Sequence, residues 1–158
     1  MKLKKWLPYI VSVGIALGVG ILSALLSKNG MEIYQENAEK PLLMPPGWLF
    51  SVVWTVLYVL MGISAARIWL LPDSSLRSKA LNRFVAQLVL NFFWSLIFFN
   101  LQAYGFAFIW LVALWILVFT MVRAFYKLDR TAAFLQIPYL VWLTFAAYLN
   151  IGVWALNG

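Results

Sequence analysis

Residues 106–126 read FAFIWLVALWILVFTMVRAFY, and this stretch decides the class of fold. It contains no Asp, Glu, Gly or Pro, and its only charged residue, Arg123, lies close to its end. About 20 consecutive apolar residues are enough to cross the hydrocarbon core of a bilayer as a helix. The stretch therefore predicts a transmembrane helix.

Four further segments of this kind fill most of the chain. We place the five spans at about 7–26, 48–71, 80–101, 106–126 and 132–156, and none of them contains Asp or Glu. Backbone polar groups in hydrocarbon need partners within the protein, and the spans lack the alternation of membrane barrel strands. The predicted fold class is all-α, an integral membrane bundle of five transmembrane helices that forms a single domain over residues 1–158.

The start of the chain resembles a signal peptide, because a basic stretch precedes an apolar run. The run is too long for a typical signal peptide and no clear cleavage site follows it, so we expect a retained first helix. An amphipathic presequence rich in Arg and Ser is also missing, which favours a bacterial cell membrane over an organelle.

The distribution of positive charge predicts the orientation of the bundle. The net charge is +7. With five spans, ten of the 12 basic residues fall on the side of the N-terminus: Lys2, Lys4, Lys5, Arg67, Arg77, Lys79, Arg83, Arg123, Lys127 and Arg130. Only Lys28 and Lys40 fall on the other side. We therefore expect a cytoplasmic N-terminus, a C-terminus outside, and membrane lipid rather than nucleic acid as the partner of these charges.

Small residues recur along the first span. Gly14 and Gly18 form a Gly-x-x-x-Gly pair, and a second set recurs every four residues: Ser12, Ala16, Gly20 and Ala24. Small residues on one helix face let a neighbouring backbone approach closely. They predict close packing within the bundle, which we favour, or the seam of a homodimer.

The first connection, residues 27–47, is the longest. Pro41, Pro45 and Pro46 restrict φ, so we expect no regular helix in this segment. Loops of this length in compact proteins are often lids or binding loops. A solvated connector is the alternative interpretation.

Aromatic and amide side chains recur at helical spacing on three spans. The sets that share a helix face are Trp54, Tyr58 and Met61; Gln87, Asn91, Trp94 and Phe98; and Tyr139, Trp142, Ala146 and Asn150. An amide within a span is costly unless it faces the bundle interior. These faces predict an aromatic cavity for a flat, largely apolar ligand. The alternative interpretation is that these side chains only join the helices and fill an aromatic core, with no ligand. Pro138 lies in the last span and could bend it or widen the mouth of a cavity.

The residue types that are missing exclude several chemistries. The chain has no His and no Cys, so thiolate metal sites, His-based triads and haem ligation by His or Cys are excluded. We expect no metal and no bound cofactor. The spans lack an acid or His, which argues against proton-coupled transport.

Three motifs, in order along the chain, resemble the signatures of one family. They are Tyr34…Lys40-Pro41…Pro45-Pro46-Gly47-Trp48…Trp54…Tyr58…Met61-Gly62, then Gln87-Leu88…Asn91…Trp94…Phe98-Phe99, then Pro138-Tyr139…Trp142…Ala146…Asn150…Trp154. With them the chain resembles the translocator protein family (TspO, or peripheral benzodiazepine receptor) over nearly its whole length.

The resemblance implies a five-helix bundle, usually a homodimer, that binds porphyrins and benzodiazepine-type ligands in a cavity closed by the first loop. Some bacterial members are associated with light-dependent porphyrin breakdown, and Trp54 and Trp142 hold the positions linked to it. Motif positions and helix faces together give the predicted ligand-binding set: Tyr34, Pro45, Trp54, Tyr58, Gln87, Asn91, Trp94, Phe98, Trp142, Ala146 and Asn150.

The chain departs from the family pattern in the first loop and in the last span. Ile33 and Leu43 stand where the family usually has Trp, which affects the lid and ligand preference. No Lys or Arg follows Tyr148, so the cholesterol-associated motif of some members is missing.

These observations support a leading hypothesis and three rivals. The leading one is a membrane receptor or sensor that binds protoporphyrin IX or another flat apolar molecule, with Trp54 and Trp142 stacking on the ligand and Tyr34 and Asn91 donating hydrogen bonds. The rivals are an enzyme that degrades porphyrin in light through the Trp pair, a tetrapyrrole transporter, and a purely structural or partner-binding protein.

Overall fold

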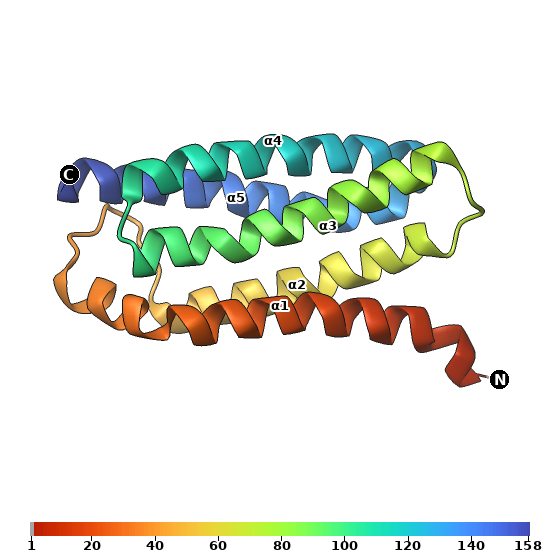
Figure 1. Ribbon diagram of the computed structural model, residues 1–158, viewed down its shortest axis with the longest axis horizontal. Helices are drawn as coiled ribbons and strands as arrows, with labels where there is room; N and C mark the ends of the chain where they lie inside the picture. Colours follow the sequence, from red (N-terminus) through yellow and green to blue (C-terminus); the bar gives the residue numbers. More distant parts are fainter. Residues whose placement is uncertain (1) are drawn as a thin grey trace.

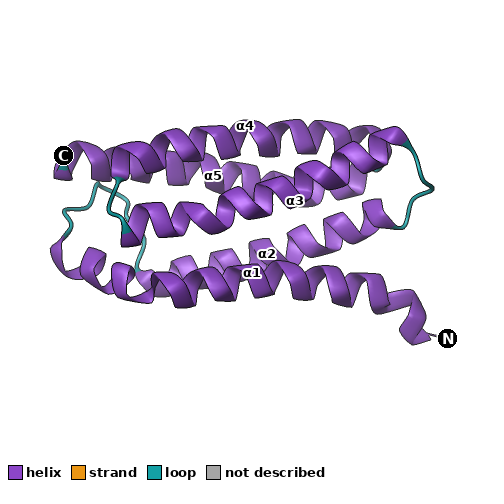
Figure 2. Cartoon of the chain, in the orientation of Figure 1, coloured by secondary structure: helices purple, strands orange, loops and turns teal. Residues whose placement is uncertain are grey.

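The computed structural model describes residues 2–158, which form five long helices joined by short connections (Figures 1 and 2). The helices are α1 (Lys2–Asn37), α2 (Gly47–Trp69), α3 (Ser75–Ser95), α4 (Tyr104–Leu128) and α5 (Arg130–Asn157), and a π-helical turn, η1 (Leu96–Asn100), extends α3. All five are long and apolar enough to span a membrane. The predicted all-α bundle of five membrane helices is therefore confirmed.

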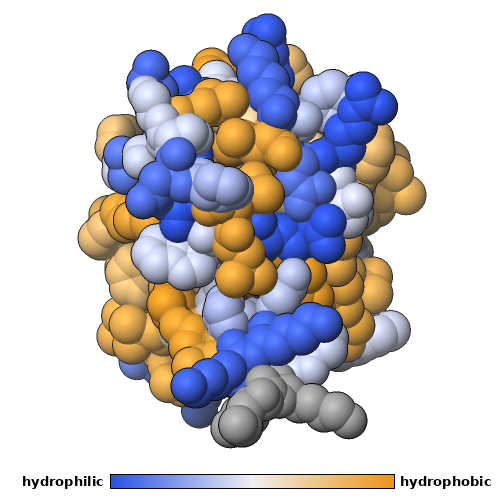
Figure 3. Space-filling model, turned by 90° about the vertical axis from the view of Figure 1, so that its right-hand side faces the viewer, coloured by the Kyte–Doolittle hydropathy of each residue, from blue (hydrophilic) through white to orange (hydrophobic). Residues whose placement is uncertain are grey.

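The helices run alternately up and down, so the two termini lie at opposite ends of the bundle (Figure 1). The N-terminus, the α2–α3 connection and the α4–α5 turn share one end, which we call the basic end. Figure 3 views this end and shows hydrophilic side chains gathered over it. Termini at opposite ends are what five helices of alternating direction require.

Capping side chains define the start of two helices at the basic end. The hydroxyl of Ser74 accepts a hydrogen bond from the backbone N–H of Arg77 at 3.0 Å, and the carboxylate of Asp129 accepts one from Thr131 at 3.1 Å. Each satisfies one of the backbone donors that a helix start leaves free. Asp129 also pairs with Arg67 at 2.7 Å, which ties α2 to the start of α5.

Burial of Asp129 opposes its ionisation, but the hydrogen bond and positive charge of Arg67 outweigh this effect. The pKa of Asp129 is therefore lowered from its ordinary value of 3.8. The carboxylate stays charged at neutral pH and holds the α4–α5 turn against α2.

The small residues of α1 divide between two faces. Ala16 is fully buried, and a Cβ on Gly20 would lie 2.4 Å from the ring of Tyr58. Gly14 and Gly18 face away, because a Cβ on either would meet nothing within 4 Å among the described residues. The favoured interpretation, packing within the bundle, therefore describes the face of Ala16 and Gly20 but not the Gly-x-x-x-Gly pair.

The first loop is shorter than predicted. Helix α1 continues to Asn37, so the prediction of a non-helical segment over 27–47 was wrong for residues 27–37, and the loop comprises residues 38–46. The prolines that interrupt helix begin only at Pro41. The extended part of α1 packs against η1, where a Cβ on Gly30 would lie 2.6 Å from the backbone of Phe99. Helix α5 continues through Pro138.

Candidate ligand cavity

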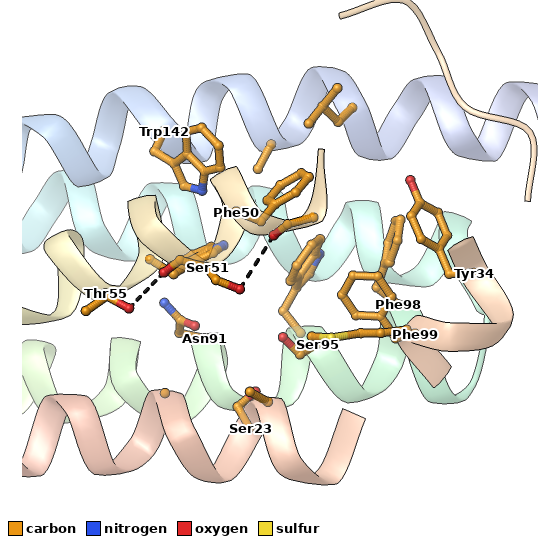
Figure 4. Close-up of a pocket in the computed structure, with 18 of the residues that line it drawn as sticks. Ser23, Tyr34, Phe50, Ser51, Thr55, Asn91, Ser95, Phe98, Phe99 and Trp142 are labelled. Carbon is orange, nitrogen blue, oxygen red and sulfur yellow. Dashed lines mark hydrogen bonds between the residues drawn. The ribbon is translucent and has the colours of Figure 1, made fainter. Parts of the chain in front are cut away.

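A cavity of about 260 Å³ lies inside the bundle, toward the end opposite the basic end. Side chains of α1, α2, α3, η1 and α5 line it, and Met44 of the first loop closes one side. Among the described residues, α4 contributes no side chain to the wall. The cavity thus lies between α1 and the layer formed by α2, α3 and α5 (Figure 4).

Two groups of aromatic rings form most of the wall. In the first, Trp54 and Trp142 meet edge to face, with ring centroids 6.4 Å apart and planes at 90°, and Phe50 lies 5.6 Å from Trp142. In the second, Trp94 stacks on Phe98 at 5.0 Å, with Tyr34 and Phe99 beside them, and Tyr104 of α4 packs against Phe98 from behind the wall. The space between the groups suits a flat ligand that stacks on indole and phenyl rings.

A directional chain of buried hydrogen bonds begins at the cavity wall. Tyr58 donates its hydroxyl to Oδ1 of Asn91 at 2.9 Å, and Asn91 donates from Nδ2 to the hydroxyl of Tyr139 at 2.7 Å. Tyr139 then donates to Oε1 of Gln87 at 2.6 Å. The hydroxyls of Tyr58 and Tyr139 each donate their single proton within this series of hydrogen bonds, so the direction of every bond in the series is fixed. It joins α2, α3 and α5 below the cavity floor.

The second amide, Asn150, is also a helix–helix link. It accepts a hydrogen bond from the indole of Trp94 at 3.1 Å and donates to the backbone carbonyl of Tyr104 at 2.9 Å. Asn91 and Asn150 thus both line the cavity and join helices.

One polar group faces the cavity without a protein partner. The indole N–H of Trp142 is buried and finds no acceptor among the described residues. Figure 4 shows its nitrogen directed toward the space between the helices. A buried N–H without a partner is costly. An acceptor atom on a ligand, or a water molecule, would satisfy it.

The first loop is fastened to α5. The side chain of Asn157 exchanges two hydrogen bonds with the backbone of Glu39, at 2.8 and 2.9 Å. Pro41 lies against Gly152, where a Cβ would come within 2.6 Å of the proline ring, and Tyr148 donates to the carbonyl of Leu42 at 2.8 Å. The loop thus forms a cover that α5 holds in place.

On its other side the loop is joined to the end of α1. Lys40 donates to the backbone carbonyls of Gln35 and Ala38, both at 3.1 Å, and lies over the ring of Tyr34. The hydroxyl of Tyr34 contacts the sulfur of Met44 at 3.5 Å. Leu43 is 77 % exposed and adopts a left-handed φ of 69°, so the residue at this departure from the family pattern points away from the cavity.

Most of the predicted side chains are brought together by the fold. Nine of the eleven lie on the cavity wall: Tyr34, Trp54, Tyr58, Asn91, Trp94, Phe98, Trp142, Ala146 and Asn150. Gln87 is fully buried beneath the wall, bonded to Tyr139, and Pro45 lies in the loop between two lining residues, Met44 and Gly47. Tyr34 is on α1 rather than in the loop.

Sequence reasoning missed part of the wall. Ser51 and Thr55 on α2, and Ser95 on α3, share the helix faces of Trp54 and Asn91, so the same periodicity could have found them. Other residues from α1 gave no such signal: Leu17, Ser23 and Met31. Helix α1 is apolar on most sides, and its sequence alone does not show which side faces the bundle.

Comparison with known proteins identifies the family to which the cavity-lining motifs belong. A family model described as the TspO/MBR family matches residues 12–155 of the chain. The chain belongs to the TspO/MBR family. The resemblance seen in the three motifs is therefore confirmed, and the TspO/MBR match spans all five helices.

Three relatives of this TspO/MBR chain, two bacterial and one mammalian, cover most of its length. Protein CrtK of Rhodobacter capsulatus is 35 % identical over 99 % of this chain and 95 % of its own length. The tryptophan-rich sensory protein of Cereibacter sphaeroides is 36 % identical over 78 % of this chain and 77 % of its own. The translocator protein of Sus scrofa is 34 % identical over 95 % of this chain and 92 % of its own. Family membership and five apolar helices together make this an integral membrane protein.

Proposed function

We propose that this protein is a membrane receptor that binds a flat, largely apolar molecule of the porphyrin class in the cavity between α1 and the layer of α2, α3 and α5. One observation carries the proposal: a partly open cavity whose wall is built from stacked and edge-to-face aromatic rings, with the free indole N–H of Trp142 directed into it. Ring faces bind a macrocycle by stacking, and the N–H supplies a donor for an acceptor atom on the ligand.

The size of the cavity adds a requirement. Its volume of about 260 Å³ lies just below the range that small-molecule sites usually occupy, roughly 300–1,000 Å³. A tetrapyrrole therefore needs more space than the closed form provides. We infer that the loop 38–46 shifts when such a ligand enters, because exposed hydrogen bonds tie it to α5 and only part of it, Ala38 and Met44, packs against a buried cluster. Lys40 of the loop supplies a cation for a carboxylate of the ligand once its bonds to the carbonyls of Gln35 and Ala38 are released.

A titration with protoporphyrin IX tests the proposal. The purified, detergent-solubilised protein is titrated in the dark, and binding is read by quenching of Trp fluorescence. We expect saturable quenching that is weakened by Trp142→Phe, which removes the free N–H. Trp6→Phe is the matched control, because Trp6 is 56 % exposed and lies outside the cavity. Absence of saturable quenching by the folded protein contradicts the proposal.

A second function is favoured by the contact between Trp54 and Trp142. Two indoles in edge-to-face contact on a ligand-stacking wall can pass an electron to a photo-excited porphyrin, and breakdown of the reduced macrocycle then requires dioxygen as the oxidant. Illumination of the titrated sample tests this alternative. Loss of the porphyrin absorption band that requires both Trp residues supports an enzyme. A stable band with saturable quenching supports a receptor.

Three other expectations stay predictions. They are a homodimer, location in a bacterial cell membrane with the basic end in the cytoplasm, and the absence of a resident cofactor or metal. Transport of tetrapyrroles, the remaining rival, predicts flux of porphyrin into sealed vesicles that contain the protein.

A further inference from the structure

A second hollow lies at the basic end, outside the bundle and far from the cavity. It is a groove of about 290 Å³ between the last turns of α4 and the first turns of α5. Its walls are apolar: Val122, Tyr126, Phe134 and Ile137. Three of these side chains face outward, with Tyr126 46 %, Phe134 60 % and Ile137 39 % exposed. In a membrane protein such a groove faces lipid.

Two cations stand at the rim of this groove. Arg123 and Lys127 both line it, and their spacing of four residues places them side by side on one face of α4. A third cation, Arg130, lies over the ring of Tyr126 at 5.3 Å. Lys127 and Arg130 therefore place positive charge at the end of the groove nearest the tip of the bundle, and Arg123 lies one turn deeper, level with Phe134.

The chain has no acid left to neutralise these three cations. It contains five Asp and Glu in all. Asp73 is paired with Arg77 and Asp129 with Arg67. The remaining acids, Glu32, Glu36 and Glu39, belong to the opposite end of the bundle. A counter-charge for Arg123 and Lys127 must come from outside this chain.

We propose that this groove binds an anionic phospholipid, with the phosphate between Arg123 and Lys127 and an acyl chain along Phe134 and Ile137. The arrangement agrees with a lipid, because Lys127 and Arg130 lie at the tip of the bundle, where headgroups are, and the apolar wall continues along α5 to Ile137, which lies nearer the membrane centre. Each Lys or Arg near a membrane surface adds to the attraction for anionic lipid. The proposal does not depend on the ligand of the cavity.

Native mass spectrometry of the full chain provides the test, with dioleoylphosphatidylglycerol and dioleoylphosphatidylcholine as probes. We expect wild type to retain the anionic lipid more strongly than the zwitterionic one. The double variant Arg123→Gln/Lys127→Gln should lose about 30-fold in affinity for phosphatidylglycerol and little for phosphatidylcholine. The matched control is Lys4→Gln/Lys5→Gln, which removes the same charge from exposed positions of α1 and should lose far less.

Two further measurements separate the site from general charge and from free phosphate. Phe134→Ala should weaken binding of both lipids, because it removes part of the apolar wall, and soluble glycerol 3-phosphate should not displace the lipid. An equal loss in the two double variants would show diffuse attraction and overturn the proposal. Displacement by glycerol 3-phosphate, or equal retention of both lipids by wild type, would overturn it as well. Thermal melts of each variant establish that it is folded.

Discussion

Asn91 donates from its amide nitrogen to the hydroxyl of Tyr139 at 2.7 Å, and this buried bond joins the cavity wall to the core between α3 and α5. Asn91 lines the cavity, whereas Tyr139 does not and is only 1 % exposed. The pair therefore separates two roles that a polar group inside a membrane protein can have, stability of the bundle and contact with a ligand.

Removing the Tyr139 hydroxyl is expected to affect stability alone. Tyr139→Phe deprives Gln87 of a donor and Asn91 of an acceptor, which should lower the free energy of unfolding by about 1 kcal/mol. Tyr58→Phe removes a hydroxyl that lies on the wall, so it should also change porphyrin affinity. Thermal unfolding and fluorescence titration measure the two effects. A change in affinity with Tyr139→Phe but not with Tyr58→Phe would contradict this assignment.

Gly152 is predicted to control the position of the first loop. A methyl group there would overlap Pro41, and the loop can relieve the overlap only by moving away from α5. In a Met44→Cys background, Gly152→Ala should raise the rate of labelling by a maleimide severalfold, since Met44 is partly covered. Gly18→Ala serves as the control, because a Cβ there meets nothing within 4 Å. Equal labelling rates in the Gly152→Ala and Gly18→Ala variants would contradict this prediction.

Close packing of α1 on α2 depends on Gly62. A Cβ at this position would lie 2.4 Å from the Cα of Val13, so the two backbones must separate in Gly62→Ala. Overpacking of this kind costs about 1–3 kcal/mol, and we expect a lower melting temperature in detergent. Gly14→Ala, on the outward face, should leave the melting temperature unchanged or raise it, because Ala favours helix more than Gly does. Equal destabilisation by both would show that α1 packs through its other face.

The pair of Arg67 and Asp129 predicts a loss of stability in acid. The folded-state pKa of Asp129 lies below its unfolded value near 3.8, so its contribution is present above that pH and is lost as the pH falls through the folded pKa. Melting temperatures of wild type and Asp129→Asn should differ at pH 7 and converge below about pH 3.8. Asn keeps a capping oxygen for α5, so the comparison isolates the charge. A difference that grows toward acid would refute the assigned sign.

The orientation in the membrane can be tested by labelling, because the chain has no native Cys. Leu42→Cys lies in the first loop and Ser75→Cys at the basic end. Ten of 12 cations at the basic end predict that a membrane-impermeant maleimide labels intact cells at residue 42 but reaches residue 75 only after permeabilisation. The reverse pattern would invert the proposed topology.

The number and the type of the helices followed from sequence because they depend on local composition. A run such as 106–126 has to be helical in hydrocarbon, whatever its neighbours are. The inward faces of α2, α3 and α5 were also readable, since Trp54, Asn91 and Trp142 recur with polar or aromatic neighbours at helical spacing. Eight of the nine predicted residues on the cavity wall were found for this reason, and the ninth, Tyr34 of α1, came from the family resemblance.

Only the tertiary structure decided the features that depend on contacts between helices: the extent of α1, the position of Gln87 and the placement of the first loop. Residues 27–37 are helical because that part of α1 packs on η1, and Gln87 lies beneath the wall because Tyr139 of α5 holds it there. The loop covers the cavity because it packs on Gly152 and bonds to Asn157, which are more than a hundred residues away in the sequence. A periodic pattern shows which residues share a face, but the partner of that face is chosen by packing of the whole bundle.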